Sequence, residues 1–179
     1  NGQDAKAQVW VMRSHGGESW PLTTAGESVE QYAWSPDSQK VAFTAMDPVP
    51  ADEKAATDRR DHERQSERPT RPVHLWVVDL ASKSATRITR GTDFTIQGGL
   101  SWSKDGAHVA FAAGASALLR DGRRDIHVVN IDSSRVEKIS PNFGPDTTPR
   151  FSPDGRTLAY LSEPVTAPPI GDGTPRGTV

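Results

Sequence analysis

Serine, histidine and aspartate side chains in this chain could in principle form a hydrolytic centre, with serine as the nucleophile and histidine as its base. In α/β hydrolases the nucleophilic serine sits in a Gly-x-Ser-x-Gly turn between a strand and a helix. The nearest match is Ser116, whose surrounding segment Gly114–Leu118 has only the first of the two glycines. The sequence therefore predicts no catalytic residue in this chain and no enzymatic activity of its own.

The five histidines do not form a metal-binding pattern. No two of them have the His-x-x-x-His spacing that places two ligands on one helix face. We expect structural or solvated roles for them, His127 standing where Trp10 and Trp76 stand in related segments. Gly98 and Gly99 lack the following Gly-Lys-Ser of a phosphate loop. The sequence therefore predicts neither a metal nor a cofactor.

Aspartate recurs at one position of a segment that is repeated three times, at 32–43, 100–111 and 149–160. Each copy reads aromatic-Ser-x-Asp, then Gly or Ser, two variable residues, and aliphatic-Ala-aromatic. Such an aspartate bonds its own backbone and the glycine accepts positive φ, which predicts a tight hairpin. The repeated aromatic residues are predicted to pack in the core between stacked units. We therefore assign structural roles to the recurring residues Trp34, Asp37, Trp102, Asp105, Gly106, Phe151, Asp154 and Gly155.

A second set of β-rich segments, at 8–12, 74–79 and 125–130, alternates with these hairpins. Each leads through a polar turn to a shorter segment, at 19–23, 85–89 and 136–140. Two hairpins in alternation make a four-stranded antiparallel unit. The hairpin aromatics are about 68 and then about 49 residues apart, against about 40–50 for one propeller blade. The sequence predicts an all-β chain built of β-propeller blades.

The predicted propeller segment covers residues 1–163 and holds two whole blades flanked by two half-blades. Because a closed propeller has about four to eight blades, we expect a partial propeller, a fragment of a longer one. The charged stretch 47–72 is poor in large apolar residues and is predicted to be an exposed loop between a second and a third strand, with some helix from Asp52 to Arg64. The Pro- and Gly-rich residues 164–179 are predicted to form a loop or tail.

The overall charge and composition exclude several functions. A formal net charge of −2 and a pI near 6.2 do not provide the basic surface that nucleic acid requires. No stretch approaches the roughly 18 consecutive apolar residues of a membrane span. The absence of cysteine excludes disulfides and leaves the compartment open between a bacterial cytoplasm and the periplasm or exterior.

The segment Trp34–Asp37 and its two relatives resemble the WD40-like repeat of TolB and of the prolyl oligopeptidase family of serine peptidases. Three further features resemble the acylaminoacyl-peptidase and dipeptidyl-peptidase branch: the Gly-Gly turn and Leu-Thr ending of 8–24, the charged insertion opening at 48–54, and 74–80 leading to 87–89. In that family an N-terminal propeller covers an α/β-hydrolase domain and restricts access to short peptides. The resemblance implies a non-catalytic scaffold and substrate gate, with the hydrolase domain and a peptide as partners.

The resemblance also implies that loops such as Arg120–Asp125 face the hydrolase or the peptide, which makes Arg120, Arg123 and Arg124 candidates for substrate or interdomain contact. The alternative for a charged loop is simple solvation. Two alternatives for the protein keep the fold: a TolB-like interaction propeller with no enzyme attached, and a propeller attached to an amidohydrolase. The charged insertion favours the peptidase, because the blades of an adaptor tend to be more uniform.

The two predicted half-blades have unpaired strand edges, which favour association. The first half-blade contains third and fourth strands, and the last contains first and second strands. We therefore expect the isolated chain either to associate edge to edge or to close its two half-blades against each other.

Overall fold

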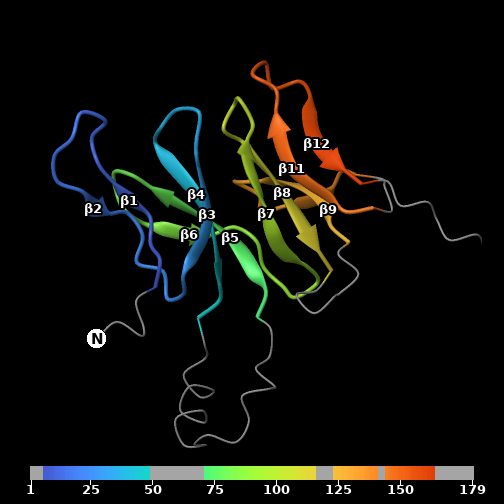
Figure 1. The fold of residues 1–179 in the computed structure, drawn as a ribbon, viewed down its shortest axis with the longest axis horizontal. Helices are drawn as coiled ribbons and strands as arrows, with labels where there is room; N and C mark the ends of the chain where they lie inside the picture. The colour runs from blue at the N-terminus through green and yellow to red at the C-terminus, as the bar shows by residue number, and fades with distance from the viewer. Residues whose placement is uncertain (1–5, 49–70, 116–122, 141–143, 164–179) are drawn as a thin grey trace, which may run out of the picture.

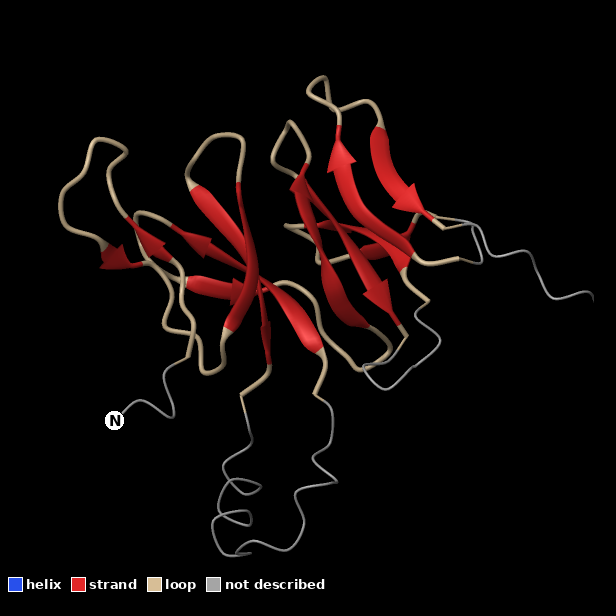
Figure 2. Cartoon of the chain, in the orientation of Figure 1, coloured by secondary structure: helices blue, strands red, loops and turns tan. Residues whose placement is uncertain are grey.

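The computed structural model describes residues 6–48, 71–115, 123–140 and 144–163, and every helix or strand assigned within them is a β-strand. The strands form four antiparallel sheets that stand one after another along the molecule (Figures 1 and 2). Two sheets have four strands and the sheets at the two ends have two strands each. The prediction of an all-β partial propeller with two whole blades and two half-blades is confirmed.

The strands follow the chain from the inner to the outer edge of each blade. The first half-blade pairs β1 (Trp10–Val11) with β2 (Trp20–Pro21). The first whole blade contains β3 (Val29–Trp34), β4 (Lys40–Met46), β5 (Val73–Asp79) and β6 (Ala85–Arg87). The second whole blade contains β7 (Thr95–Trp102), β8 (His108–Gly114), β9 (Asp125–Asn130) and β10 (Val136–Lys138). The last half-blade pairs β11 (Asp146–Phe151) with β12 (Leu158–Ser162).

The long charged stretch connects the second and third strands of the first whole blade, since β4 ends at Met46 and β5 begins at Val73. Residues 49–70 of the predicted insertion 47–72 and the predicted tail 164–179 lie outside the described residues. In the first half-blade, the strands β1 and β2 are shorter than the predicted segments 8–12 and 19–23. The reason is that β1 has no second strand on its other edge among the described strands, whereas β5 and β9 do.

The strand registers give each blade two distinct ends. At one end lie the tight turns, because Val41 pairs with both Trp34 and Val78 next to the β3–β4 and β5–β6 turns. At the opposite end lie the connections from second to third strands and from one blade to the next, because Met46 pairs with Val73 there. We call these ends the hairpin face and the loop face. Figure 1 shows the β3–β4, β7–β8 and β11–β12 turns on the same side of the molecule.

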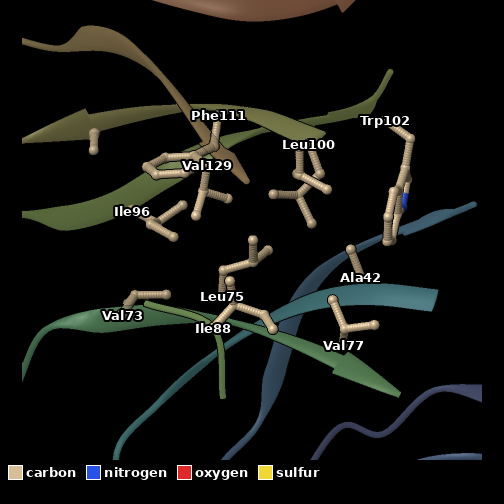
Figure 3. Close-up of a cluster of buried hydrophobic side chains, with 12 residues drawn as sticks. Ala42, Val73, Leu75, Val77, Ile88, Ile96, Leu100, Trp102, Phe111 and Val129 are labelled. Carbon is tan, nitrogen blue, oxygen red and sulfur yellow. The ribbon is translucent and has the colours of Figure 1, made fainter. Parts of the chain in front are cut away.

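The core lies between successive blades, so each blade is apolar on both sides. In β4, Val41, Phe43 and Ala45 pack toward the first half-blade, while Ala42 packs toward the second whole blade. This is why the strand reads as a continuous buried run instead of alternating with polar residues. Figure 3 shows the main cluster between the two whole blades, which contains Leu75, Val77, Leu100, Trp102, Phe111 and Val129 among others.

The inner strands of neighbouring blades approach each other closely at Gly99. The amide of Gly99 in β7 donates to Oε1 of Gln31 in β3 at 2.8 Å. On its other side, a Cβ built on Gly99 would lie 2.6 Å from Cδ of Pro149 in β11, and φ of Gly99 is +73°. No other residue fits this position without moving a blade, because a side chain would overlap the next inner strand and be strained at this φ.

The repeated aromatic position has a different environment in each blade. Trp102 is 8% exposed, belongs to the main core cluster and donates from Nε1 to the carbonyl of Ala33 at 3.1 Å. Trp34, which was also expected to pack in the core, is 45% exposed. The reason is the neighbour: the side chain of Trp34 lies on the side of the first half-blade, which has no described first or second strand to cover it.

This difference gives a stability prediction. Trp102→Ala should lower the free energy of unfolding by about 3–5 kcal/mol, because it leaves a cavity between the two whole blades. Trp34→Ala, at the same repeat position, should cost less than half as much in a dilute sample. Urea unfolding followed by circular dichroism measures both values. Equal costs would contradict the assignment of the core to the space between these blades.

Candidate functional site

The turn of the repeat is built around a serine. In the second whole blade, Oγ of Ser103 accepts from the amide of His108 at 2.9 Å and donates to Oδ1 of Asp105 at 2.5 Å. The same Oδ1 accepts from the amide of Ala107 at 3.0 Å, and Gly106 takes φ +71°. The serine therefore joins the two strands of the hairpin, and the aspartate orders the turn between them.

The same geometry appears in the other two copies. Ser35 donates to Asp37 at 2.6 Å and Ser152 donates to Asp154 at 2.5 Å. Gly155 has φ +77°, and Ser38 stands at the equivalent place with φ +59°. The serine hydroxyl first, and the turn amide second, hold the pKa of each aspartate below its usual value. These aspartates therefore stabilise the fold above their usual pKa, and the contribution is lost as the pH falls through the folded value.

A second repeated contact was not anticipated from the sequence. A hydroxyl residue after each fourth strand accepts from a buried third-strand amide: Val9 to Thr23 at 2.9 Å, Leu75 to Thr89 at 2.9 Å, and Ile126 to Ser140 at 3.0 Å. We call these contacts the hydroxyl latches. The signal in the sequence is the aliphatic-hydroxyl pair that ends each repeat, which appears as Leu22-Thr23, Ile88-Thr89 and Ile139-Ser140.

Charged side chains gather on the loop face where the insertion leaves the first whole blade. Glu27 lies 3.0 Å from Nζ of Lys6 and 2.9 Å from Nη1 of Arg71. The guanidinium of Arg71 also donates to the carbonyl of Asp47, and the carboxylate of Asp47 lies 2.9 Å from Arg87. The two residues that flank the insertion, Asp47 and Arg71, are thus joined to each other and to the connection from the first half-blade.

Asp47, His74 and Thr89 lie in the order acid, histidine and hydroxyl that a catalytic triad has. Nε2 of His74 lies 3.7 Å from Asp47, and Nδ1 of His74 lies 3.2 Å from the hydroxyl of Thr89. However, His74 is fully buried and Thr89 is nearly so, and the Thr89 hydroxyl already accepts from the Leu75 amide. Burial, and next the positive charge of Arg87, lower the pKa of His74. No substrate atom can reach this group, so we interpret it as part of the blade core.

The arginines proposed from the sequence lie on the same face, at the start of β9. Arg123 is exposed, and Arg124 is half-buried, with Nε donating to Oε1 of Gln97 at 2.6 Å. The carbonyl of Arg124 also accepts from the amide of Asp146 at 2.8 Å, which ties the second whole blade to the last half-blade. Arg120 lies outside the described residues. Arg124 therefore lies at the junction of two blades, and Arg123 precedes it in the chain.

Asp146 is a further residue on the loop face that the sequence analysis did not single out. It is fully buried, and within the described part of the chain no hydrogen-bond partner is found for either carboxylate oxygen. Its pairing with Ser162 matches the pairing of Ile96 with Ala113 and of Val29 with Ala45. An acidic group thus occupies a position that is apolar in the sister blades, which costs stability. The loop face therefore contains a residue that lowers the stability of the fold.

The ring of His127 replaces an indole of the first whole blade. Phe111, Phe94 and His127 stack with centroid distances of 5.7–5.9 Å, as Phe43 and Trp76 stack at 6.3 Å. Burial lowers the pKa of His127, and the carbonyl and charge of Asp125 oppose this only in part. His127 is therefore a neutral packing residue, as expected from its alignment with Trp76.

Within the ranges that the structure describes, no group of three or more histidine, aspartate or glutamate side chains is arranged to hold a metal ion. The same ranges contain no helix with the length and apolar character needed to cross a membrane.

The stacked four-stranded blades and their repeated turns define part of a β-propeller. A putative TolB from Agrobacterium tumefaciens superposes on 91% of this chain with a TM-score of 0.65 and 22% identity, and this chain covers 48% of that structure. A prolyl endopeptidase structure superposes on 88% of the chain with a TM-score of 0.56 and 18% identity, with 23% of that structure covered. The structural neighbours thus include TolB proteins, peptidases and an oligogalacturonate lyase, and at these identities they show the shared fold.

Proteins similar in sequence are likewise named as peptidases or as TolB. Dipeptidyl-peptidase 5 of Porphyromonas gingivalis is 39% identical over 66 residues, which is 35% of this chain and 10% of that protein. The peptidase YuxL of Bacillus subtilis is 25% identical over 86% of this chain and 18% of its own length. A TolB homolog of Chlorobium luteolum is 25% identical over 87% of this chain and 28% of its own length. The chain therefore spans less than a third of these relatives, and no family model matches it.

The hydroxyl latches predict a specific stability loss. Thr89→Val keeps the shape of the side chain but leaves the buried Leu75 amide without its acceptor, so the free energy of unfolding should fall by about 1–3 kcal/mol. The matched control, Thr86→Val on the exposed side of β6, should change it by less than about 0.5 kcal/mol. Urea denaturation measures both. An equal response of the two variants would show that the latch contributes nothing.

His74, which is fully buried, and His127, which is half-buried, predict a loss of stability in mild acid. Both pKa values are lowered in the folded state, so the unfolded chain takes up protons below a pH near 6.5 more readily than the folded chain. Stability should be fully present above that pH and decrease as the pH falls toward the folded values. His127→Phe keeps the ring stack and removes one of the two groups, so the pH dependence should become shallower. The exposed control His15→Phe should leave the curve unchanged, and a wild-type-like curve for His127→Phe would refute this explanation.

Proposed function

We propose that this chain is the propeller segment of a serine peptidase, in which the blades act as a scaffold and restrict substrate access to a separate α/β-hydrolase domain. The observation that carries this proposal is the 39% identity over 66 residues with dipeptidyl-peptidase 5. The second peptidase relative adds a similarity that extends over 86% of the chain. The proposal assigns no catalytic residue to this chain.

The two faces of the blades indicate which side would meet the hydrolase. The hairpin face carries short turns of nearly identical geometry, which suit packing more than selective recognition. The loop face carries the strand ends that both long second-to-third connections join, and the polar side chains at those ends, including Arg71 and Arg124. We assign the loop face to the hydrolase and the peptide, with Arg120, Arg123 and Arg124 as contact residues.

A second candidate function is a TolB-like propeller that binds protein partners without an attached enzyme. The TM-score of 0.65 with a putative TolB favours it. The two candidates differ in what the full-length protein contains. A Gly-x-Ser-x-Gly segment downstream of the propeller is required by the peptidase and is not expected in the adaptor.

The test uses the full-length protein and short chromogenic aminoacyl, dipeptidyl and acylaminoacyl substrates. We expect turnover that a serine-directed inhibitor abolishes, and no turnover by residues 1–179 alone. The double variant Arg123→Ala/Arg124→Ala should raise KM severalfold with little change in kcat, because it removes binding charge and leaves the nucleophile intact. Arg135→Ala on the hairpin face, whose side chain is exposed beside Glu137, is the matched control.

Two results would contradict the proposal in different ways. A full-length protein without inhibitor-sensitive turnover would favour the adaptor. Inhibitor-sensitive turnover by residues 1–179 alone would mean that a nucleophile lies within this chain. Equal KM values for the double variant and the control would be compatible with the peptidase assignment but would contradict the assignment of the loop face as the contact surface.

A further inference from the structure

The space between the second whole blade and the last half-blade is charged at a place where the space before it is apolar. Between the two whole blades, Val73 of β5 and Ile96 of β7 belong to the main core cluster and lie in the same space (Figure 3). One blade further along, the register of β9, continued by one residue, puts Arg124 at the position of Val73. The register of β11 puts Asp146 at the position of Ile96. An arginine and an aspartate thus replace an apolar pair.

The two replacing residues are neighbours in space, although they belong to different blades. The amide of Asp146 donates to the carbonyl of Arg124 at 2.8 Å. The backbones are therefore close enough for the long side chain of an arginine to bring its guanidinium to the carboxylate. In the structure it does not do so, because both carboxylate oxygens of Asp146 are buried without a hydrogen-bond partner among the described residues.

The guanidinium of Arg124 is held at the loop face by a different acceptor. Its Nε donates to Oε1 of Gln97 at 2.6 Å. Gln97 lies beside Gly114, since a Cβ built on Gly114 would be 3.0 Å from Nε2 of Gln97. The sister position in β4 is Met46, on the same side of the strand as Ala42, which packs toward the following blade. The glycine therefore leaves room for Gln97 and Arg124 on the side that faces the last half-blade.

This arrangement leaves one of its three polar groups unsatisfied. A buried carboxylate without a partner destabilises a fold, and an opposite charge with good geometry offsets that cost. Lys138 of β10 is already paired with Asp125 at 2.8 Å. Arg124 is the cation that the repeat places opposite Asp146. When Arg124 bonds to Gln97 the carboxylate has no partner, and when it bonds to Asp146 the amide of Gln97 loses its donor.

We propose that Arg124 has two positions, one on Gln97 at the loop face and one on Asp146 between the blades. Asp146 is then a positioning residue, because it sets the fraction of molecules in which the charge of Arg124 is available at the loop face. A partner that binds this guanidinium selects the outward position, and its apparent affinity is reduced by the fraction of inward molecules. The coupling of the two charges is independent of the proposed function, whereas the effect on substrate rests on it.

The first test is a double-mutant cycle on the stability of the chain, measured by urea unfolding. Arg124→Met keeps an unbranched side chain and removes the charge, and Asp146→Leu restores the apolar character of the sister blades. We expect Arg124→Met to lower the folding equilibrium constant at least about tenfold more when Asp146 is present than in the Asp146→Leu background. Arg135→Met, at an exposed arginine of the hairpin face, is the matched control and should show no such coupling.

The second test measures KM and kcat of the full-length protein. Gln97→Ala removes the outward acceptor, so KM should rise severalfold with kcat unchanged while Arg124 itself is intact. Asp146→Leu should lower KM, and adding it to Gln97→Ala should bring KM back to the wild-type value or below. Asp146→Asn, which keeps the size of the side chain, should act in the same direction. Asp132→Leu removes an equal charge from an exposed turn of the hairpin face and should not rescue Gln97→Ala.

The outcomes separate this proposal from the proposed function. Equal effects of Arg124→Met with and without Asp146 would show that the two charges are not coupled and would overturn the proposal. A raised KM of Gln97→Ala that neither Asp146→Leu nor Asp146→Asn restores would overturn it as well, because a second acceptor would then have no role. A full-length protein without inhibitor-sensitive turnover would contradict the proposed function, while a coupling found in the first test would still support the two positions of Arg124.

Discussion

Burial on both faces of each blade is the constraint on which the rest of the structure depends. A strand such as β4 presents Phe43 to one neighbour and Ala42 to the other, and neither side can face water without losing the burial that stabilises it. A blade is therefore stabilised by a neighbour on each side. The same requirement explains the continuous apolar strands, the different exposure of Trp34 and Trp102, and the apolar ends of the stack.

The sequence was sufficient for the fold because the blade signal is local and repeated. Hairpin residues such as Asp105 and Gly106 determine their own turn, and three copies confirm one another. The environment of Trp34 could not be predicted, because it depends on the neighbouring sheet and not on the segment itself. The hydroxyl latch and the burial of Asp146 were missed for a similar reason: each depends on a partner about 14 or more residues away, across strands whose register the sequence does not specify.

The two faces of the blades differ in how closely their contacts repeat. On the hairpin face, the same serine and aspartate contacts recur with little variation. On the loop face the blades differ from one another: one has the Asp47 and Arg71 ion pairs, another has Arg124 on Gln97, and the last has a buried Asp146. Departure from the repeat is what recognition of a particular partner requires, since identical blades would present identical surfaces.

The contact of Gly99 with Pro149 has a geometric consequence. Inner strands that nearly touch at Gly99, with bulkier side chains such as Phe111 and Val129 packed on the second and third strands, make each blade a wedge. The absence of a side chain at position 99 sets the thin end of that wedge, and the side chains of the second and third strands set the thicker part. The angle between two blades, and through it the number of blades that close a circle, therefore depends on the difference in side-chain volume between the inner strand and the strands outside it.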